Sequence, residues 1–268
     1  MSLLFYKFEI MIKKILFIPF LLLTMTLFSQ EKSNAFKDGE WLRYDMSYSG
    51  FLKAGTAELS VKETELNGKK VYHSTGKGRT SGMIGWFFKV KDNYQSYFDM
   101  VTGKPYLFKR KINEGGYKKH KEITFDYQTK KANVKNILKK KTTSVSIEDV
   151  QDMISSFYYL RNQNTDKLKK GDAIEIDMFF DEKTYPFKLK FLGKELLKTK
   201  FGKVQSLKFR PIVQAGRVFK ENESVTIWVT ADKNKIPIKM RASLSVGSLR
   251  AELSAYKGLA NSFKIVFD

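Results

Sequence analysis

The chain has 268 residues, 14% of them aromatic, and its 49 Lys and Arg against 28 Asp and Glu give a formal net charge of +21. Cysteine is absent, which excludes disulfide frameworks, Cys-ligated zinc, iron–sulfur clusters, thiol nucleophiles and a lipid-bearing cysteine. Aromatic side chains suit half-buried pleated surfaces, so the composition favours strands, and the positive charge favours anionic partners without naming one.

The first 30 residues have the pattern of a signal peptide. Lys13 and Lys14 precede an apolar run from Ile15 to Phe28, and polar residues follow at once. The run holds 14 residues, fewer than the roughly 20 that span a bilayer, which favours a cleaved signal over a membrane anchor. We therefore expect an exported protein, periplasmic or associated with the outer membrane, whose mature part, residues 31–268, forms a single β domain.

Alternation of period two, which places successive side chains on opposite faces of a strand, begins at residues 41–48 and continues at 57–61. Asn67-Gly68 then marks a hairpin before the run at 71–75, so the first three strands are expected to form a meander. Seven strands are expected before residue 140. The remaining four are at 90–99, 104–113, 117–127 and 130–136.

Three consecutive aromatic residues, Trp86, Phe87 and Phe88, interrupt this series directly after Gly82-Met83-Ile84-Gly85. Sites for lipids and other apolar ligands are concave and lined by aromatic rings, so the three residues are candidates for a ligand pocket. Filling of the core is the commoner use of so apolar a stretch.

The densest basic run follows the seventh strand and contains Lys135, Lys139, Lys140 and Lys141. Such runs are most often solvated loops. They also contact anionic headgroups, so these lysines are candidates for an anionic surface and for peripheral membrane contact. Nucleic acid is not expected as a partner of an exported protein.

One segment has helical spacing instead of period two. Asp152 precedes it as a plausible N-cap, and the segment ends near Arg161. A lone helix in a β protein must bury its apolar stripe, so we expect a helix near 152–162 packed on the sheet or plugged into it. The stripe consists of Met153, Ile154, Phe157, Tyr158 and Leu160.

The second half returns to short runs separated by turn residues, among them Gly193 and Gly202. No alternation of strands with helices is present. The expected fold is therefore mainly β, an antiparallel meander forming a curved sheet, sandwich or barrel-like domain with one packed helix. The runs are at 172–181, 184–192, 195–200, 203–213, 222–230, 235–246 and 248–257.

Few side chains suggest catalysis. His73 and His120 are far apart in the sequence, and we interpret both as ordinary strand residues. Neither a metal nor a cofactor is therefore expected. Glu175 and Asp177 lie two apart on a predicted strand, which places their carboxylates on one face about 6–7 Å apart, near the separation that glycosidases use. A solvated strand face is the more usual explanation of such a pair.

Several short motifs are spread over nearly the whole mature chain. They are Gly39-Glu40-Trp41-Leu42-Arg43-Tyr44, Gly55-Thr56-Ala57, Tyr97-Phe98-Asp99 with Thr102-Gly103, the helix from Gln151 to Arg161, and Trp228-Val229-Thr230-Ala231-Asp232 with Ile236-Pro237-Ile238. Together these motifs resemble the DUF3108 family of exported bacterial proteins of unknown function. The resemblance implies an extracytoplasmic β-rich protein and supplies no catalytic residue. The family often has Pro after the Asp that opens the helix, where this chain has Met153.

These observations favour a noncatalytic protein that binds a lipid or an anionic component of the cell envelope. A structural or assembly partner in the envelope is the first alternative, and a carbohydrate-active enzyme that uses Glu175 and Asp177 is the second.

Overall fold

The computed structural model describes residues 34–213, 225–244 and 246–267, so the expected signal peptide lies outside the described residues. The described residues form fourteen strands and two short helices, α2 (Gly82–Phe87) and α3 (Ser155–Arg161). The strands are β1 (Trp41–Tyr48), β2 (Leu52–Leu66), β3 (Lys69–Thr80), β4 (Lys91–Asp99), β5 (Pro105–Glu114), β6 (Tyr117–Asp126), β7 (Lys131–Asn136), β8 (Lys141–Ser146), β9 (Ala173–Phe180), β10 (Lys183–Thr199), β11 (Gly202–Val213), β12 (Val225–Thr230), β13 (Pro237–Ser243) and β14 (Ser248–Lys257).

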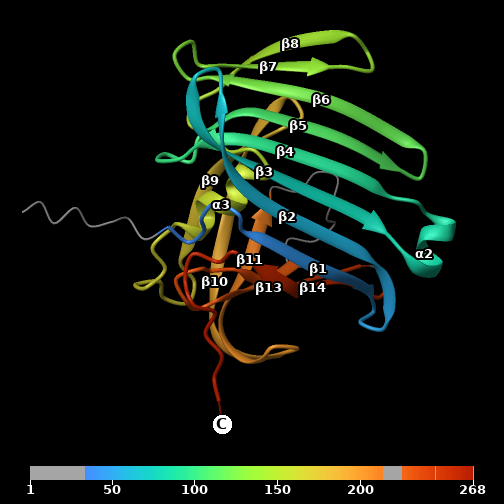
Figure 1. Cartoon of the computed structure of the whole chain (residues 1–268), viewed down its shortest axis with the longest axis vertical. Helices are drawn as coiled ribbons and strands as arrows, with labels where there is room; N and C mark the ends of the chain where they lie inside the picture. Colours follow the sequence, from blue (N-terminus) through green and yellow to red (C-terminus); the bar gives the residue numbers. More distant parts are fainter. Residues whose placement is uncertain (1–33, 214–224, 245, 268) are drawn as a thin grey trace, which may run out of the picture. The chain divides into compact units, whose positions relative to one another are not determined.

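All of these strands belong to one antiparallel sheet (Figure 1). Strands that follow one another in the chain are neighbours from β1 to β8 and from β9 to β14, and the pairing of β1 with β14 joins the two meanders. The predicted mainly β fold, with a meander of the first three strands, is confirmed. In the described part of the chain the sheet is not closed, because its edge strands β8 and β9 do not pair with each other.

The segment that leaves β8 connects the two edges of the sheet. Gln151 forms a parallel bridge with Met178 of β9. The N–H of Gln151 donates to the carbonyl of Asp177 and the N–H of Phe179 donates to the carbonyl of Gln151, each at 2.8 Å. The sheet must curve to bring β9 to this segment, and the curvature gives the described residues their barrel-like form.

Helix α3 contacts β4 and β9 and lies between the two meanders (Figure 1). Tyr158 is 1% exposed in the largest hydrophobic cluster, Ile154 packs against both this cluster and the one formed by β5–β9, and Leu160 packs against the cluster of β10–β12. The N–H groups of Ile154 and Ser155 donate to Oδ1 of Asp152 at 2.7 and 2.8 Å. The predicted packed helix is confirmed. The prediction of Asp152 as its N-cap is wrong, because the residue before α3 is Ile154, which makes no side-chain capping bond, and Asp152 binds the N–H groups from two residues earlier.

The predicted break at Gly193 is wrong, because β10 runs through it from Lys183 to Thr199. Gly193 has a φ of 121° and lies where the register with β11 shifts after Phe191. A glycine inside a strand permits a bulge without ending the strand, since it adopts a positive φ at little cost.

Two elements were not predicted. Strand β8 has the sequence KTTSVS, in which no apolar face alternates with a polar one, so the sequence shows no strand period. Helix α2 covers Gly82-Met83-Ile84-Gly85 and the first two of the three aromatic residues, Trp86 and Phe87. No helix in the described ranges is long and apolar enough to cross a membrane.

Candidate anion-binding site

Two adjacent pockets lie where β6 begins, beside the β7–β8 turn, and both are lined by Lys118, Lys119 and Leu138. We call the larger pocket, of about 650 Å³, the outer pocket. We call the smaller one, of about 450 Å³, the inner pocket. We call their lining residues together the basic region. The outer pocket is lined further by Lys91, Asn93, Gln95, Lys109, Lys111, Ile112, Asn113 and His120, and the inner pocket by Tyr117, Lys121, Val134, Asn136, Lys139, Lys141, Thr143 and Glu182.

The outer pocket is the more strongly basic of the two. Five lysines line it and no acidic side chain does. In the described part of the chain no carboxylate lies within ion-pair distance of Lys91, Lys111 or Lys118. Ammonium groups without a carboxylate partner, placed beside side-chain amides that donate hydrogen bonds, fit an anionic ligand.

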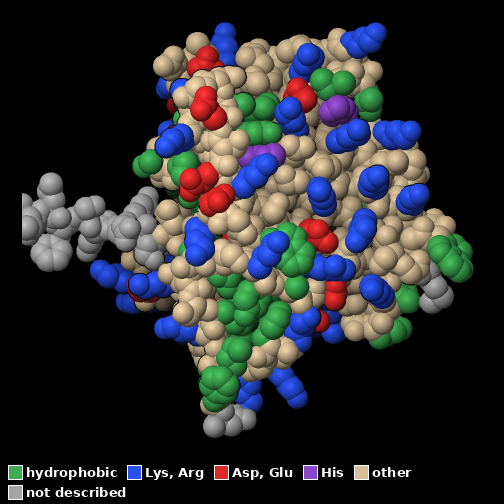
Figure 2. Space-filling view, viewed as in Figure 1, with side chains coloured by type: hydrophobic (Ala, Val, Ile, Leu, Met, Phe, Trp, Pro, Cys, Tyr) green, Lys and Arg blue, Asp and Glu red, His purple; other side chains and the backbone are tan. Residues whose placement is uncertain are grey.

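The strand register explains how one face carries so many lysines. Like charges directly opposite each other on paired strands are destabilising. Three of the outer lysines have amides, a histidine or a glutamate as cross-strand partners, whereas Lys119 lies opposite Ile112 and Lys91 lies opposite Arg79 of β3. Lys109 lies opposite Gln95 and Glu122, Lys111 opposite Asn93 and His120, and Lys118 opposite Asn113. Figure 2 shows this face of the sheet, with Lys and Arg side chains spread across it.

The inner pocket is partly neutralised by the β9–β10 turn. Nζ of Lys119 lies 3.0 Å from Oδ2 of Asp181, and Nζ of Lys121 lies 3.0 Å from Oε1 of Glu182. Burial alone would raise the pKa of Asp181, but Lys119, Lys121 and Arg110 hold it below the usual value. These ion pairs attach the turn to β5 and β6, so the inner pocket has less free positive charge than the outer one.

The four lysines of the predicted basic run separate in the structure. Lys139 and Lys141 line the inner pocket. Lys140 lies in the β7–β8 turn with a φ of 49°, and Lys135 lies on β7 opposite Glu122. The structure therefore brings two of the four to the basic region. It adds lysines from β4–β6 that are spread through the sequence and form no run.

The predicted aromatic candidates lie on the surface. Trp86 and Phe87 at the end of α2 are 86% and 88% exposed, and Phe88 is 50% exposed. The core-filling alternative is wrong for this stretch, because the short helix projects from the end of β3. None of the three lines either pocket of the basic region.

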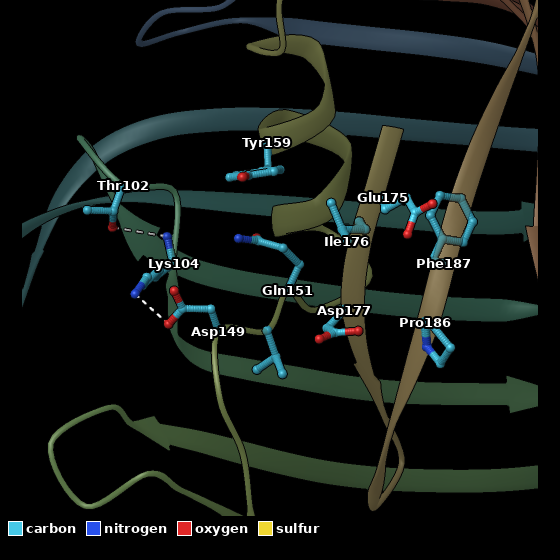
Figure 3. Close-up of a pocket in the computed structure, with 11 residues that line it drawn as sticks. Thr102, Lys104, Asp149, Gln151, Tyr159, Glu175, Ile176, Asp177, Pro186 and Phe187 are labelled. Atoms are coloured by element: carbon cyan, nitrogen blue, oxygen red, sulfur yellow. Dashed lines mark hydrogen bonds and ion pairs between the residues drawn. The ribbon is translucent and has the colours of Figure 1, made fainter. Parts of the chain in front are cut away.

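A third pocket, of about 390 Å³, contains the predicted carboxylate pair (Figure 3). Glu175 and Asp177 line it from β9, and both are exposed. Nζ of Lys188 lies 2.6 Å from Oε1 of Glu175. A glycosidase holds its two carboxyl groups on either side of a bound glycan, whereas Glu175 is exposed and engaged by Lys188 on the same surface. The arrangement fits the solvated strand face better than the catalytic pair.

The two histidines occupy strands, as predicted. The ring of His73 stacks on Tyr97 at 4.1 Å and its Nε2 lies 3.0 Å from Oε1 of Gln95, while burial lowers the pKa of His73. His120 lines the outer pocket. Within the described ranges no three His, Asp or Glu side chains are grouped so that they could hold a metal ion.

Comparison with known proteins agrees with this fold. The family model of the protein of unknown function DUF3108 matches residues 43–254. A β-barrel-like protein of the DUF1849 domain of unknown function from Brucella abortus is similar, with a TM-score of 0.53 and 12% identity over 82% of this chain and 98% of that chain.

Two further solved structures are similar at lower scores. One is a DUF1089 family protein from Pseudomonas aeruginosa, with a TM-score of 0.36 and 9% identity over 68% of this chain and 87% of that chain. The other has a YmcC-like fold and comes from Bacteroides fragilis, with a TM-score of 0.32 and 7% identity over 83% of this chain and 97% of that chain. No curated protein matches this chain.

Proposed function

Because the chain belongs to the DUF3108 family, whose function is unknown, we propose its function from its own surface: it is a noncatalytic protein that binds an anionic component of the cell envelope in the basic region. The ligand class is a phosphate- or carboxylate-bearing molecule, either free or as the headgroup of a lipid. The carrying observation is the outer pocket, with its five lysines and no acidic side chain.

The location in the envelope rests on the N-terminal segment. Lys13 and Lys14 followed by the apolar run from Ile15 to Phe28 have the order of charge and hydrophobicity that export signals use. A formal charge of +21 also suits a protein that works beside anionic surfaces.

The basic region is tested by removing its unpaired lysines together. In the variant Lys91→Gln/Lys111→Gln/Lys118→Gln, the affinity for inorganic polyphosphate at low salt is expected to fall about tenfold or more, because three exposed cations leave the pocket. Isothermal titration calorimetry measures this affinity, and vesicles containing phosphatidylglycerol in place of polyphosphate distinguish a lipid headgroup from a free anion.

The matched control is Lys167→Gln/Lys169→Gln/Lys170→Gln, in the connection between α3 and β9. These three lysines are also exposed, so the control removes the same charge from another surface. It is expected to bind almost as tightly as the wild type. Equal losses in the two triple variants would show that net charge alone attracts the anion, and the proposal of a defined site would then fail.

A further inference from the structure

Antiparallel neighbours turn alternately at the two ends of the strands, so several connections lie at one end, the β9–β10 turn among them. Five of these connections carry exposed apolar side chains. They are the β1–β2, β5–β6, β7–β8 and β13–β14 turns and the α2 segment between β3 and β4, and we call this end the rim (Figure 1). Hydrogen bonds join its members. Ser49 N–H donates to the carbonyl of Ser248 at 2.7 Å, and Gly115 N–H donates to the carbonyl of Lys89 at 2.9 Å.

The rim exposes large hydrophobic side chains. Phe51, Trp86, Phe87 and Val246 are between 77% and 88% exposed. These side chains extend from turns and from the end of a short helix, and Figure 2 shows hydrophobic side chains projecting where α2 lies. Isolated exposed hydrophobic residues are common, but several on one end of a protein mark an interaction surface. Phe88, Tyr117, Leu138 and Leu244 add further exposed apolar area from the same connections.

The charge of the rim is predominantly positive. The β9–β10 turn brings Asp181 and Glu182 to the same end, but these two carboxylates pair with Lys119 and Lys121. The segments 49–53, 81–91, 115–118, 137–141 and 244–248 contain seven lysines and no Asp or Glu. The lysines are Lys53, Lys89, Lys91, Lys118, Lys139, Lys140 and Lys141.

We propose that the rim docks the protein on an anionic lipid bilayer, with the exposed aromatic rings entering the headgroup region and the rim lysines contacting the headgroups. Aromatic rings are favoured at the boundary between headgroups and acyl chains, and each lysine near an anionic bilayer adds to the attraction. This surface overlaps the outer pocket at Lys91, Lys118 and Leu138 and borders the inner pocket at Tyr117, Lys139 and Lys141. It differs from both pockets in its exposed residues Phe51, Trp86 and Phe87.

A bilayer fits this surface better than an apolar small molecule or a second copy of the chain. The rings project outward, where a pocket would enclose its ligand. A second copy would bring the seven rim lysines against seven of the same charge, whereas an anionic bilayer is complementary to them.

The experiment uses the protein expressed with its own N-terminal segment, and intact-mass spectrometry first identifies the N-terminus of the purified protein. Sedimentation with vesicles of phosphatidylcholine, with and without phosphatidylglycerol, measures partitioning. The wild type is expected to sediment with the anionic vesicles and less so at high salt. Emission from the exposed Trp86 is expected to shift to shorter wavelength on binding.

The test variant is Phe51→Ser/Trp86→Ser/Phe87→Ser, whose replaced side chains are each at least 84% exposed and so contribute little to folding. Its partitioning is expected to fall about tenfold or more. Val101→Ser is the matched control, because Val101 is 79% exposed in the β4–β5 connection at the opposite end of the strands. The control is expected to partition as the wild type does.

Three results would overturn the rim proposal: unchanged partitioning of the triple variant, an equal loss in Val101→Ser, or a lipid-free dimer that the triple variant abolishes. The triple variant retains every lysine, so its affinity for polyphosphate is expected to remain that of the wild type. Failure of the rim proposal is therefore distinguishable from failure of the proposed function.

Discussion

Replacement of Arg161 by Met is expected to lower the free energy of unfolding by about 3–5 kcal/mol, because it leaves the Glu40 carboxylate buried without its partner. Glu40 is 1% exposed and Arg161 is 3% exposed. Nη1 and Nη2 of Arg161 donate to the two carboxylate oxygens of Glu40 at 2.6 and 2.8 Å. The variant also removes the donors to the carbonyls of Ala35 and Asn234.

This ion pair connects segments that are distant in the chain. Arg161 ends α3, Glu40 precedes β1 and Asn234 lies between β12 and β13. Loss of the ion pair is therefore expected to destabilise both meanders in a single unfolding transition. Urea unfolding followed by far-UV circular dichroism measures this transition.

Two controls separate the ion pair from packing. Glu40→Leu/Arg161→Met removes both charges and is expected to recover part of the loss. Tyr44→Phe removes a buried hydroxyl that has no hydrogen-bond partner within the described residues, so it is expected to cost little. A cost below about 1 kcal/mol for Arg161→Met, the range of an exposed pair, would contradict the account.

Replacement of Asp152 by Ala is expected to cost about 2–4 kcal/mol, because three donors lose their acceptor inside the core. Asp152 is fully buried and accepts hydrogen bonds from the N–H groups of Ile154 and Ser155 and, at 2.6 Å, from the hydroxyl of Ser96. Asp152→Asn keeps a carbonyl oxygen for the backbone donors, so its cost is expected to be small. Equal losses in the two variants would show that the acceptor is not what stabilises α3.

The same residue predicts a pH dependence. Burial raises the pKa of Asp152 to about 6 from an ordinary value of 3.8. The folded state therefore binds the proton more tightly than the unfolded state does. This contribution to stability is fully present below pH 3.8 and is lost as the pH rises through about 6.

The variant Asp152→Asn cannot titrate at this position. The difference in free energy of unfolding between wild type and Asp152→Asn is therefore expected to change by about 2–3 kcal/mol between pH 4 and pH 7. Urea unfolding of both proteins across this range measures it. A constant difference would show that Asp152 titrates at its ordinary value.

The fold was largely predictable because most of its information is local. Period-two alternation at 41–48 and the Asn67-Gly68 turn are each visible within a few residues, and both predict the strands that form. Strand β8 is not predicted because the residues of its partly buried face, Thr143 and Val145, include only one apolar side chain, so the sequence shows no apolar period. The bulge at Gly193 is a property of the pairing between β10 and β11, which no single segment encodes.

The site was less predictable because it depends on register between strands. Lys91, Lys111 and Lys118 are separated in sequence and meet only when β4, β5 and β6 pair. The lysines between Lys135 and Lys141 are close together in the sequence. The alternation of side chains along β7 and the β7–β8 turn nevertheless place them on different surfaces. The position of Asp181 beside Lys119 depends on the curvature of the whole sheet, so no local signal predicts it.

Native mass spectrometry of the protein purified from its own cell envelope tests most directly whether the basic region holds an anion. We expect a retained phosphate- or carboxylate-bearing molecule that is absent from Lys91→Gln/Lys111→Gln/Lys118→Gln and present in the Lys167→Gln/Lys169→Gln/Lys170→Gln control. Retention of a neutral molecule, or of a stoichiometric protein partner with no anion, would contradict this expectation.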